Sequence, residues 1–230
     1  MKDILRYWGK SGKSDKDECE LLWHPMLYHS LDCAAVAKAW IDSSLGIKRA
    51  LLLKNNMSWA LFFVYMHDYG KLSTTFQTLN IPLWKKLFSG FETDIQQKLA
   101  NPYQHGTEGS NKFHHDIGAD PDNFDRCVWM AEAGDHHHRY KTGSPKIQVF
   151  SKKGTPLWGH EIKARNEFIN IGINLFFEGR SVDFLDAPPV PNTFKGFCTI
   201  CDWIASNPDF FPFSTQENSP IDYFESRIPF

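Results

Sequence analysis

The sequence predicts a mainly α-helical protein, and three observations on the 230-residue chain support this fold class. Several apolar stretches contain helix-forming residues at three- and four-residue spacing. Alternating strand patterns are scarce. No internal repeat and no linker rich in Gly, Ser or Pro divides the chain. Because 42% of the residues are hydrophobic, enough for one sizeable core, we expect a single domain over residues 1–230.

The first helix is predicted over 30–41, where helix formers and apolar residues cover much of the surface that a helix would have. Residues 58–68 are apolar on every face and favour a buried helix, although their aromatic residues would also suit a buried strand. The segment 71–100 contains Pro82 and Gly90 and predicts short helices joined by turns. Further helices are expected over 125–133, 161–177 and 194–204.

Residues 139–159 contain five basic residues, no acidic residue and three aromatic residues. This composition predicts a long basic loop, with or without a small hairpin. Arg139 and Lys141 are candidate contacts for single-stranded nucleic acid, which binds to cations and stacks on aromatic rings. The alternative is an ordinary solvated surface loop.

Composition excludes several classes of protein. The longest apolar run, 59–66, has eight residues, whereas a membrane-spanning helix needs about 20. The amino terminus carries charges where a signal peptide needs an apolar stretch, which predicts a cytoplasmic protein without a membrane partner. Five cysteines are a poor disulfide framework, so reduced thiols are expected. A net charge of −2 leaves nucleic-acid binding to local basic patches.

Histidine carries the functional signal. His67 and Asp68 directly follow the apolar segment 58–66, where a buried element reaches an edge. An imidazole and a carboxylate placed there can bind one cation, although such a pair more often caps a helix end. One or two cations need four to eight donors from distant segments, and this chain offers them. The further candidate donors are His29, His105, His136, His137, His138 and Asp202.

The order H…HD-x-G-K…H-G…HH…D resembles the signature of the HD superfamily of metal-dependent phosphohydrolases. More narrowly, the chain resembles the HD nuclease domain of the CRISPR-associated nuclease-helicase of type I systems. The motifs that carry this resemblance extend over nearly the whole chain: WGKS at 8–11, HPMLYHSLDCAAVA at 24–37, HDYGKLSTTFQ at 67–77, QHGTEGS at 104–110, AGDHHHRY at 133–140 and CDWIASNPDFF at 201–211. The resemblance implies an HD-domain helical fold.

The resemblance also implies a centre of two divalent transition-metal ions, from Mn, Fe, Co, Ni and Zn, with Mg as a further candidate. Such a pair activates water and neutralises phosphate charge. One ion would be held by His29, His67, Asp68 and Asp202. The second, bridged by Asp68, would be held by His105, His136 and His137. Because the family usually shows His-His-Gly where this chain has three histidines, His137 and His138 are the alternative pair.

Other residues receive weaker assignments. Asp68 and Lys71 are the candidate catalytic residues. Lys71 is a phosphate contact or an electrostatic support, with an ordinary surface lysine as the alternative. Ser206 and Asn207 are candidate substrate contacts or helix caps.

Three other sites, comprising five residues, are assigned structural roles. His24 is expected to pack, and the His114–His115 pair to lie in a solvated loop or helix start. Cys198 and Cys201 have helical spacing and no second pair, so a core role is favoured over zinc binding.

The resemblance implies a metal-dependent nuclease that degrades single-stranded DNA in CRISPR interference. The alternatives are a phosphohydrolase of small nucleotides and a non-catalytic docking domain. The implied partners are a superfamily 2 helicase domain, in cis or in trans, and an RNA-guided surveillance complex. The chain lacks a P-loop, and its last residues, DYFESRIPF, resemble the segment leading into that helicase. We therefore expect the amino-terminal part of a larger nuclease-helicase or a separate HD subunit.

Overall fold

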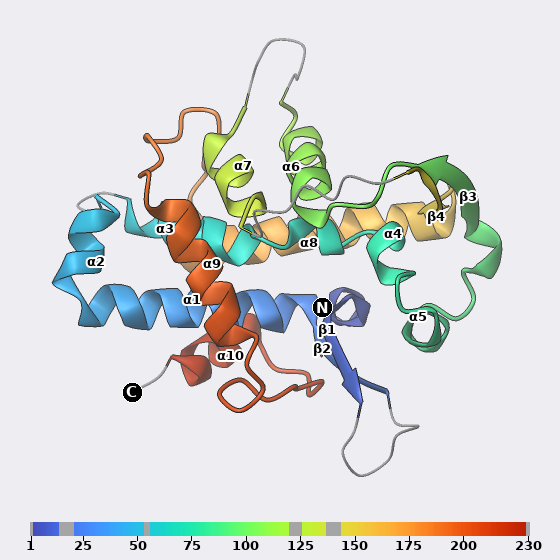
Figure 1. The fold of residues 1–230 in the computed structure, drawn as a ribbon, viewed down its shortest axis with the longest axis horizontal. Coiled ribbons are helices and arrows are strands. Elements are labelled where there is room, and N and C mark those ends of the chain that lie inside the picture. The colour runs from blue at the N-terminus through green and yellow to red at the C-terminus, as the bar shows by residue number, and fades with distance from the viewer. Residues whose placement is uncertain (1, 14–20, 53–55, 120–125, 137–143, 229–230) are drawn as a thin grey trace.

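The computed structural model describes residues 2–13, 21–52, 56–119, 126–136 and 144–228 (Figure 1). Helices dominate these residues, which confirms the mainly α class. The α-helices are α1 (Met26–Ser43), α2 (Leu45–Ala50), α3 (Met57–Met66), α4 (Thr74–Gln77), α5 (Ile81–Leu87), α6 (His105–Asp116), α7 (Val128–Gly134), α8 (Pro156–Phe176), α9 (Phe194–Ala205) and α10 (Pro220–Arg227). Short 3₁₀ helices are η1 (Ile4–Arg6), η2 (Tyr69–Lys71) and η3 (Glu92–Asp94).

Helix α3 lies at the centre of the core. The helical interpretation of 58–68 is confirmed, because Met57–Met66 forms an α-helix whose residues from Ala60 onward are buried. It packs against α1, α7, α8 and α9, and the long helices α1 and α8 run along the longest axis of the molecule (Figure 1). A helix that is apolar on every side requires such neighbours all round. The end of α3 therefore places the next two residues, His67 and Asp68, inside the protein.

The described residues also form two small antiparallel sheets, and these correct two sequence predictions. Strand β4 (Lys146–Ser151) pairs with β3 (Ile95–Ala100), and not with a neighbouring strand of its own basic segment. The end of 71–100 is thus a strand, where only helices and turns were expected. Neither strand contains a fully buried residue, so neither shows the apolar alternation by which a strand is found in a sequence. Strands β1 (Trp8–Lys13) and β2 (Leu21–Pro25) form the other sheet.

Helix α6 begins at His105, so His114 and His115 occupy its last turn and not a loop or a helix start. The position of α6 is set by two close contacts between its backbone and the backbones of η2 and α7. A Cβ added at Gly70 would lie 1.9 Å from the carbonyl oxygen of His105, and one added at Gly106 would lie 1.9 Å from the carbonyl oxygen of Gly134. Glycine is the residue that permits such contacts. They bring η2, α6 and α7 together at the end of α3.

Asp32 anchors α1 to the carboxyl-terminal part of the chain. Its buried carboxylate accepts hydrogen bonds from Nε of Arg227 at 2.7 Å, the hydroxyl of Tyr223 at 3.1 Å and Nε2 of His24 at 2.9 Å. The His24 ring also stacks on Phe213, in agreement with the packing role expected for it. Asp32, the aspartate of the HSLD motif, is therefore held by α10 and β2. His29, the histidine of the same motif, does not take part in these contacts.

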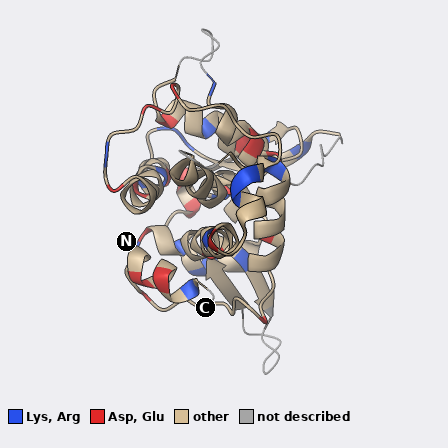
Figure 2. Ribbon diagram, turned by 90° about the vertical axis from the view of Figure 1, so that its left-hand side faces the viewer, with Lys and Arg blue, Asp and Glu red and all other residues tan. Residues whose placement is uncertain are grey.

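The surface carries charges of both signs. Basic and acidic positions are interspersed on the helices in Figure 2, as a net charge of −2 would suggest. Within the described ranges, no helix combines the length and apolarity needed to cross a membrane. Cys33, Cys127, Cys198 and Cys201 are free and buried, and Cys19 lies outside the described residues.

Candidate metal centre

Six of the predicted donors come together from five segments of the chain. His29 lies in the first turn of α1, His67 and Asp68 follow α3, and His105 opens α6. His136 follows α7 by two residues, and Asp202 belongs to α9. The buried members of this cluster are His29, His67, Asp68, His136 and Asp202. His105, with 21% of its side chain exposed, lies at the rim.

Asp68 is the centre of the cluster. Its Oδ2 lies 3.4 Å from Nε2 of His29 and 3.2 Å from Nε2 of His67. Its Oδ1 lies 3.1 Å from Nε2 of His105 and 3.7 Å from Nε2 of His136. Each carboxylate oxygen thus faces two imidazole nitrogens that come from separate segments.

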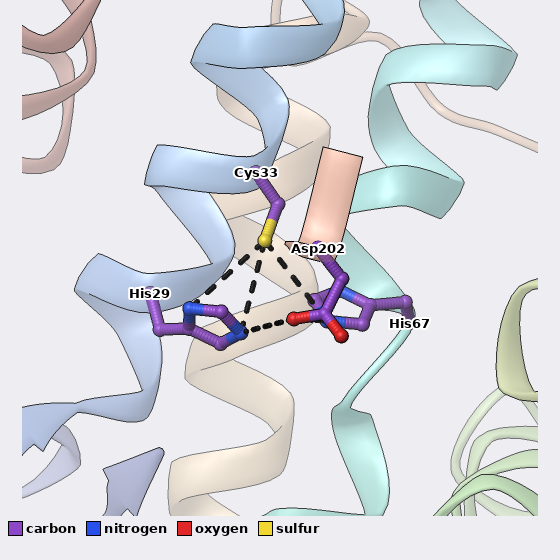
Figure 3. Close-up of side chains that lie close together, drawn as sticks. All are labelled: His29, Cys33, His67 and Asp202. Atoms are coloured by element: carbon purple, nitrogen blue, oxygen red, sulfur yellow. Dashed lines mark hydrogen bonds and ion pairs between the residues drawn. The ribbon is translucent and has the colours of Figure 1, made fainter. Parts of the chain in front are cut away.

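Asp202 completes the side of the cluster formed by α1 and α3 (Figure 3). Its Oδ1 lies 3.1 Å from Nε2 of His29 and 3.7 Å from Nε2 of His67. Ser206, one turn later, donates a hydrogen bond to the same oxygen at 2.9 Å. A buried carboxylate with this many polar neighbours is fixed in orientation.

Two of the histidine rings are oriented by the ends of helices. Nδ1 of His67 donates to the carbonyl oxygen of Val64 at 2.8 Å, and Nδ1 of His136 donates to that of Ala133 at 2.8 Å. Carbonyls in the last turn of a helix lack a partner within the helix, so they are available as acceptors. A proton fixed on Nδ1 leaves Nε2 as the coordinating nitrogen, and both Nε2 atoms point toward Asp68.

Lys71 lies inside the cluster and not on the surface. Its Nζ is 2.5 Å from Oδ2 of Asp68 and donates to the carbonyl oxygen of Gly9 at 3.2 Å. Its side chain is buried, which excludes the alternative of an ordinary surface lysine. Burial lowers the pKa of the Lys71 ammonium. Burial also acts to raise the pKa of Asp68, but Lys71 and His67 outweigh it and hold that pKa well below its usual range.

Two residues of the cluster were not identified from the sequence. Nζ of Lys10, in β1, lies 3.2 Å from Oδ1 of Asp202. Lys10 belongs to the WGKS motif, which was found in the sequence without a role for its lysine. The sulfur of Cys33 lies 3.7 Å from Nε2 of His29, and the four-residue spacing of Cys33 from His29 could have indicated this contact, since such residues share a helix face.

The remaining predicted residues are either outside the described residues or make a local contact only. His137, His138, Arg139 and Lys141 fall outside the described residues. Oδ1 of Asn207 accepts a hydrogen bond from the backbone of Asp209 at 2.9 Å, which is a local turn contact.

The donor set fits divalent transition-metal ions. Imidazole, carboxylate and thiol groups together suit Mn, Fe, Co, Ni and Zn. Among the described residues, two groups of side chains have ligand atoms within 4.8 Å of one another, and both consist only of buried residues. They are His29, Cys33, His67 and Asp202, and His67, Asp68 and His136. The two groups share His67, so they form one continuous centre.

Protons and metal ions should compete for His29. Burial by itself lowers the pKa of His29, but the Cys33 sulfur and the Asp202 carboxylate outweigh it and raise the pKa from 6.5 to about 9. The protonated ring therefore stabilises the metal-free fold below pH 6.5, and this contribution is lost as the pH rises to about 9. Metal binding requires the unprotonated ring, so its contribution to stability increases as the pH rises.

We therefore expect Ni²⁺ to raise the Tm by an increasing amount as the pH is raised from 6.5 toward about 9. Thermal unfolding with and without Ni²⁺ across this range measures the effect. The same series on His115→Gln is the control, because the side chain of His115 is 81% exposed. A Ni²⁺-induced shift that does not change with pH would contradict the expected competition.

Comparison with known proteins identifies relatives over the whole chain. The family described as "Cas3, HD domain" matches residues 8–211. The CRISPR-associated endonuclease/helicase Cas3 of Escherichia coli (strain K12) is 28% identical, over 99% of this chain and 29% of the relative. The CRISPR-associated nuclease/helicase Cas3 of Streptococcus thermophilus is 26% identical, over 99% of this chain and 27% of the relative. The chain thus spans less than a third of the length of these relatives.

Solved structures have the same fold. T. fusca Cas3 with AMPPNP matches with a TM-score of 0.61 and 18% identity, over 97% of this chain and 26% of that one. The Thermus thermophilus cas3 HD domain in the presence of Ni²⁺ matches with a TM-score of 0.51 and 21% identity, over 99% of this chain and 87% of that one. These structures confirm the helical fold, and the family match over residues 8–211 confirms the resemblance that the motifs indicated. The chain therefore belongs to the Cas3 HD-domain family.

Proposed function

We propose that this chain hydrolyses phosphodiester bonds of single-stranded DNA in CRISPR interference, with two divalent transition-metal ions. The position of Asp68 carries the proposal, because its two oxygens each face a separate pair of imidazoles at 3.1–3.7 Å. A carboxylate between two sets of nitrogen donors is the bridging ligand that a pair of cations requires. The solved T. thermophilus HD domain in the presence of Ni²⁺ supports an ion of this class.

We assign two metal sites that share Asp68. The His29 site consists of His29, His67, Asp68 and Asp202. The His105 site consists of Asp68, His105 and His136, with His137 as a further ligand proposed from the sequence. When bound, the two ions supply the Lewis acidity that activates water and neutralises the charge of the phosphate.

The chain itself keeps the donors ready for this chemistry. The carbonyls of Val64 and Ala133 hold the rings of His67 and His136 with Nε2 toward Asp68. The Lys71 ammonium contacts Oδ2 of Asp68, so it keeps this carboxylate ionised and oriented. Because Lys71 is buried, we assign it a positioning role and not a phosphate contact. Catalytic sites of this kind depend on such fixed supporting contacts.

Substrate should approach from the side of Lys10 and His105. Their side chains are 24% and 21% exposed, whereas the other side chains of the cluster are at most 6% exposed. We propose that Lys10, whose ammonium is already directed at Asp202, contacts a DNA phosphate at this rim. Ser206, Asn207, Arg139 and Lys141 remain proposed substrate contacts, of which Ser206 is hydrogen-bonded to Asp202.

A helicase is the expected partner. The curated relatives are named endonuclease/helicase or nuclease/helicase, and this chain matches less than a third of their length. We propose that a helicase domain, in cis or in trans, delivers a single strand to the cluster, and that an RNA-guided surveillance complex recruits both. A separated strand brings the phosphates within reach of a recessed centre.

Digestion of circular single-stranded DNA tests the proposed function. We expect cleavage with Mn²⁺ or Ni²⁺, none with excess chelator, and slower cleavage of the same sequence as a duplex. Free nucleoside triphosphates serve as the second substrate class, and their hydrolysis without cleavage of the polymer would support the small-nucleotide alternative. Metal binding without hydrolysis of either substrate would support a docking domain. His115→Gln should match the unsubstituted chain, whereas His67→Gln should be inactive.

A further inference from the structure

Cys33 places a sulfur atom inside the His29 site. It lies in α1 one turn after His29, and its side chain is fully buried. Its Sγ is 3.7 Å from Nε2 of His29 and 4.0 Å from Nε2 of His67. Figure 3 shows the sulfur pointing from α1 toward the two rings and the carboxylate of Asp202. A thiol in a purely structural role would face other apolar side chains.

The separations of these atoms are close to those between neighbouring ligands of one cation. Metal–nitrogen distances of about 2.0–2.1 Å and metal–sulfur distances of about 2.3 Å place neighbouring donors roughly 3.4–3.6 Å apart. The sulfur is 3.7 Å from Nε2 and 4.0 Å from Nδ1 of His29, so it lies beside the face of that ring, and it is 4.0 Å from Nε2 of His67. Oδ1 of Asp202 is 3.1 Å from Nε2 of His29 and 3.7 Å from Nε2 of His67. All four ligand atoms lie within 4.8 Å of one another. The four ligand atoms are therefore near enough to one another for a single ion to bind them.

The other described cysteines do not lie among potential metal ligands. Cys127, Cys198 and Cys201 are buried, but none of them belongs to a group of potential metal ligands among the described residues. Cys127 precedes α7 and lies far from α1 in the sequence. Burial raises the pKa of the Cys127 thiol to about 11, so this cysteine remains protonated. It is therefore a suitable control for any signal assigned to Cys33.

We propose that Cys33 is a ligand of the metal ion at the His29 site, and that its sulfur selects thiophilic ions there. On binding, the S–H bond breaks, the proton passes to solvent, and the sulfur lone pair forms the bond to the metal. No electron is transferred, and no co-reactant is needed. Thiolate ligands favour Zn²⁺, Co²⁺, Ni²⁺ and Fe²⁺, whereas Mg²⁺ and Mn²⁺ prefer oxygen ligands. The inference rests on the proposed metal centre and is independent of nuclease activity.

Titration of the metal-free chain with Co²⁺ tests the sulfur ligand by absorption. A Co²⁺ ion bound through sulfur gives an intense near-ultraviolet band from sulfur-to-metal charge transfer, and d–d bands report any bound Co²⁺. We expect both in the unsubstituted chain and in Cys127→Ser. Cys33→Ser should keep the d–d bands and lose the charge-transfer band. Circular dichroism establishes that each variant is folded.

The outcomes separate this inference from the metal centre itself. Bound Co²⁺ without a charge-transfer band in the unsubstituted chain would overturn the sulfur ligand and leave the centre intact. A band that persists in Cys33→Ser would also overturn it. No d–d bands in any variant would reject the centre and Cys33 together. X-ray absorption of the unsubstituted Co²⁺ complex needs no variant, and a sulfur scatterer at about 2.3 Å is the expected result; a first shell of nitrogen and oxygen only would contradict it.

Metal selectivity gives a second measurement. We expect Cys33→Ser to weaken Zn²⁺ binding at the centre by at least about 10-fold, the lower limit seen when even an outer partner of a metal ligand is lost. Mn²⁺ binding should change much less, because a hydroxyl oxygen replaces the sulfur. Competition of each ion with a chromophoric chelator measures both constants. An equal loss for the two ions, or no loss of Zn²⁺ affinity, would overturn the proposed selectivity.

Discussion

Asp68→Asn should reduce metal-dependent cleavage of circular single-stranded DNA by at least about 100-fold, since even outer partners of metal ligands are worth 10–100-fold in activity. Asparagine keeps the shape of the side chain but removes the negative charge from the centre of the cluster. Both metal sites lose their shared ligand, because each oxygen of Asp68 faces two imidazoles. Initial cleavage rates at saturating Mn²⁺ or Ni²⁺ measure the effect.

The matched control is Asp186→Asn, an exposed aspartate whose backbone N–H donates to the nearby side chain of Asp183, and this variant should cleave at the parent rate. Because Asp68→Asn also leaves the buried Lys71 ammonium without its anionic partner, the variant loses stability. Asp68→Asn combined with Lys71→Met removes both charges and restores the fold. Cleavage by this folded double variant at a rate within about 10-fold of the parent would contradict the bridging role, since it is less than a lost ligand should cost.

The donors were accessible to sequence reasoning, whereas the way they are held was not. His29, His67, Asp68, His105 and Asp202 stand in motifs whose order identifies them. Their meeting point depends on helix packing between segments as distant as α1 and α9, which no local pattern encodes. The prediction that these donors meet in one site therefore came from the family resemblance and not from the local sequence patterns.

The residues and strands that were not predicted depend on contacts that local sequence patterns do not reveal. Lys10 and Asp202 are in contact although they are 192 residues apart in the sequence, so only the folded structure reveals the pair. Cys33 lies within the motif at 24–37, but no ligand role was predicted for it, because its neighbours in α1 form an apolar helical pattern. Strands β3 and β4 are half-exposed and remote in sequence, and such strands carry little of the alternation that the prediction used.

Gly106→Ala should destabilise the protein by about 3 kcal/mol or more, at the upper end of what overpacking costs. The added Cβ would lie 1.9 Å from the carbonyl oxygen and 2.8 Å from the carbonyl carbon of Gly134. Both are backbone atoms, so no side chain can rotate to make room. Helix α6 must then move away from α7, and this separates His105 from His136. Urea unfolding of the metal-free chain measures the loss of stability.

Gly159→Ala is the matched control for the loss of a helical glycine. Gly159 lies in α8, and a Cβ added there would meet no atom within 4 Å. Replacing it should therefore stabilise the protein by about 0.5–1 kcal/mol, because alanine has the higher helix propensity. The two substitutions are chemically identical, so their opposite signs isolate the contact between α6 and α7. A Gly106→Ala protein that unfolds within about 1 kcal/mol of the parent, an ordinary effect for a point substitution, and still shows the full Ni²⁺-induced rise in Tm would show that this contact does not position the metal ligands.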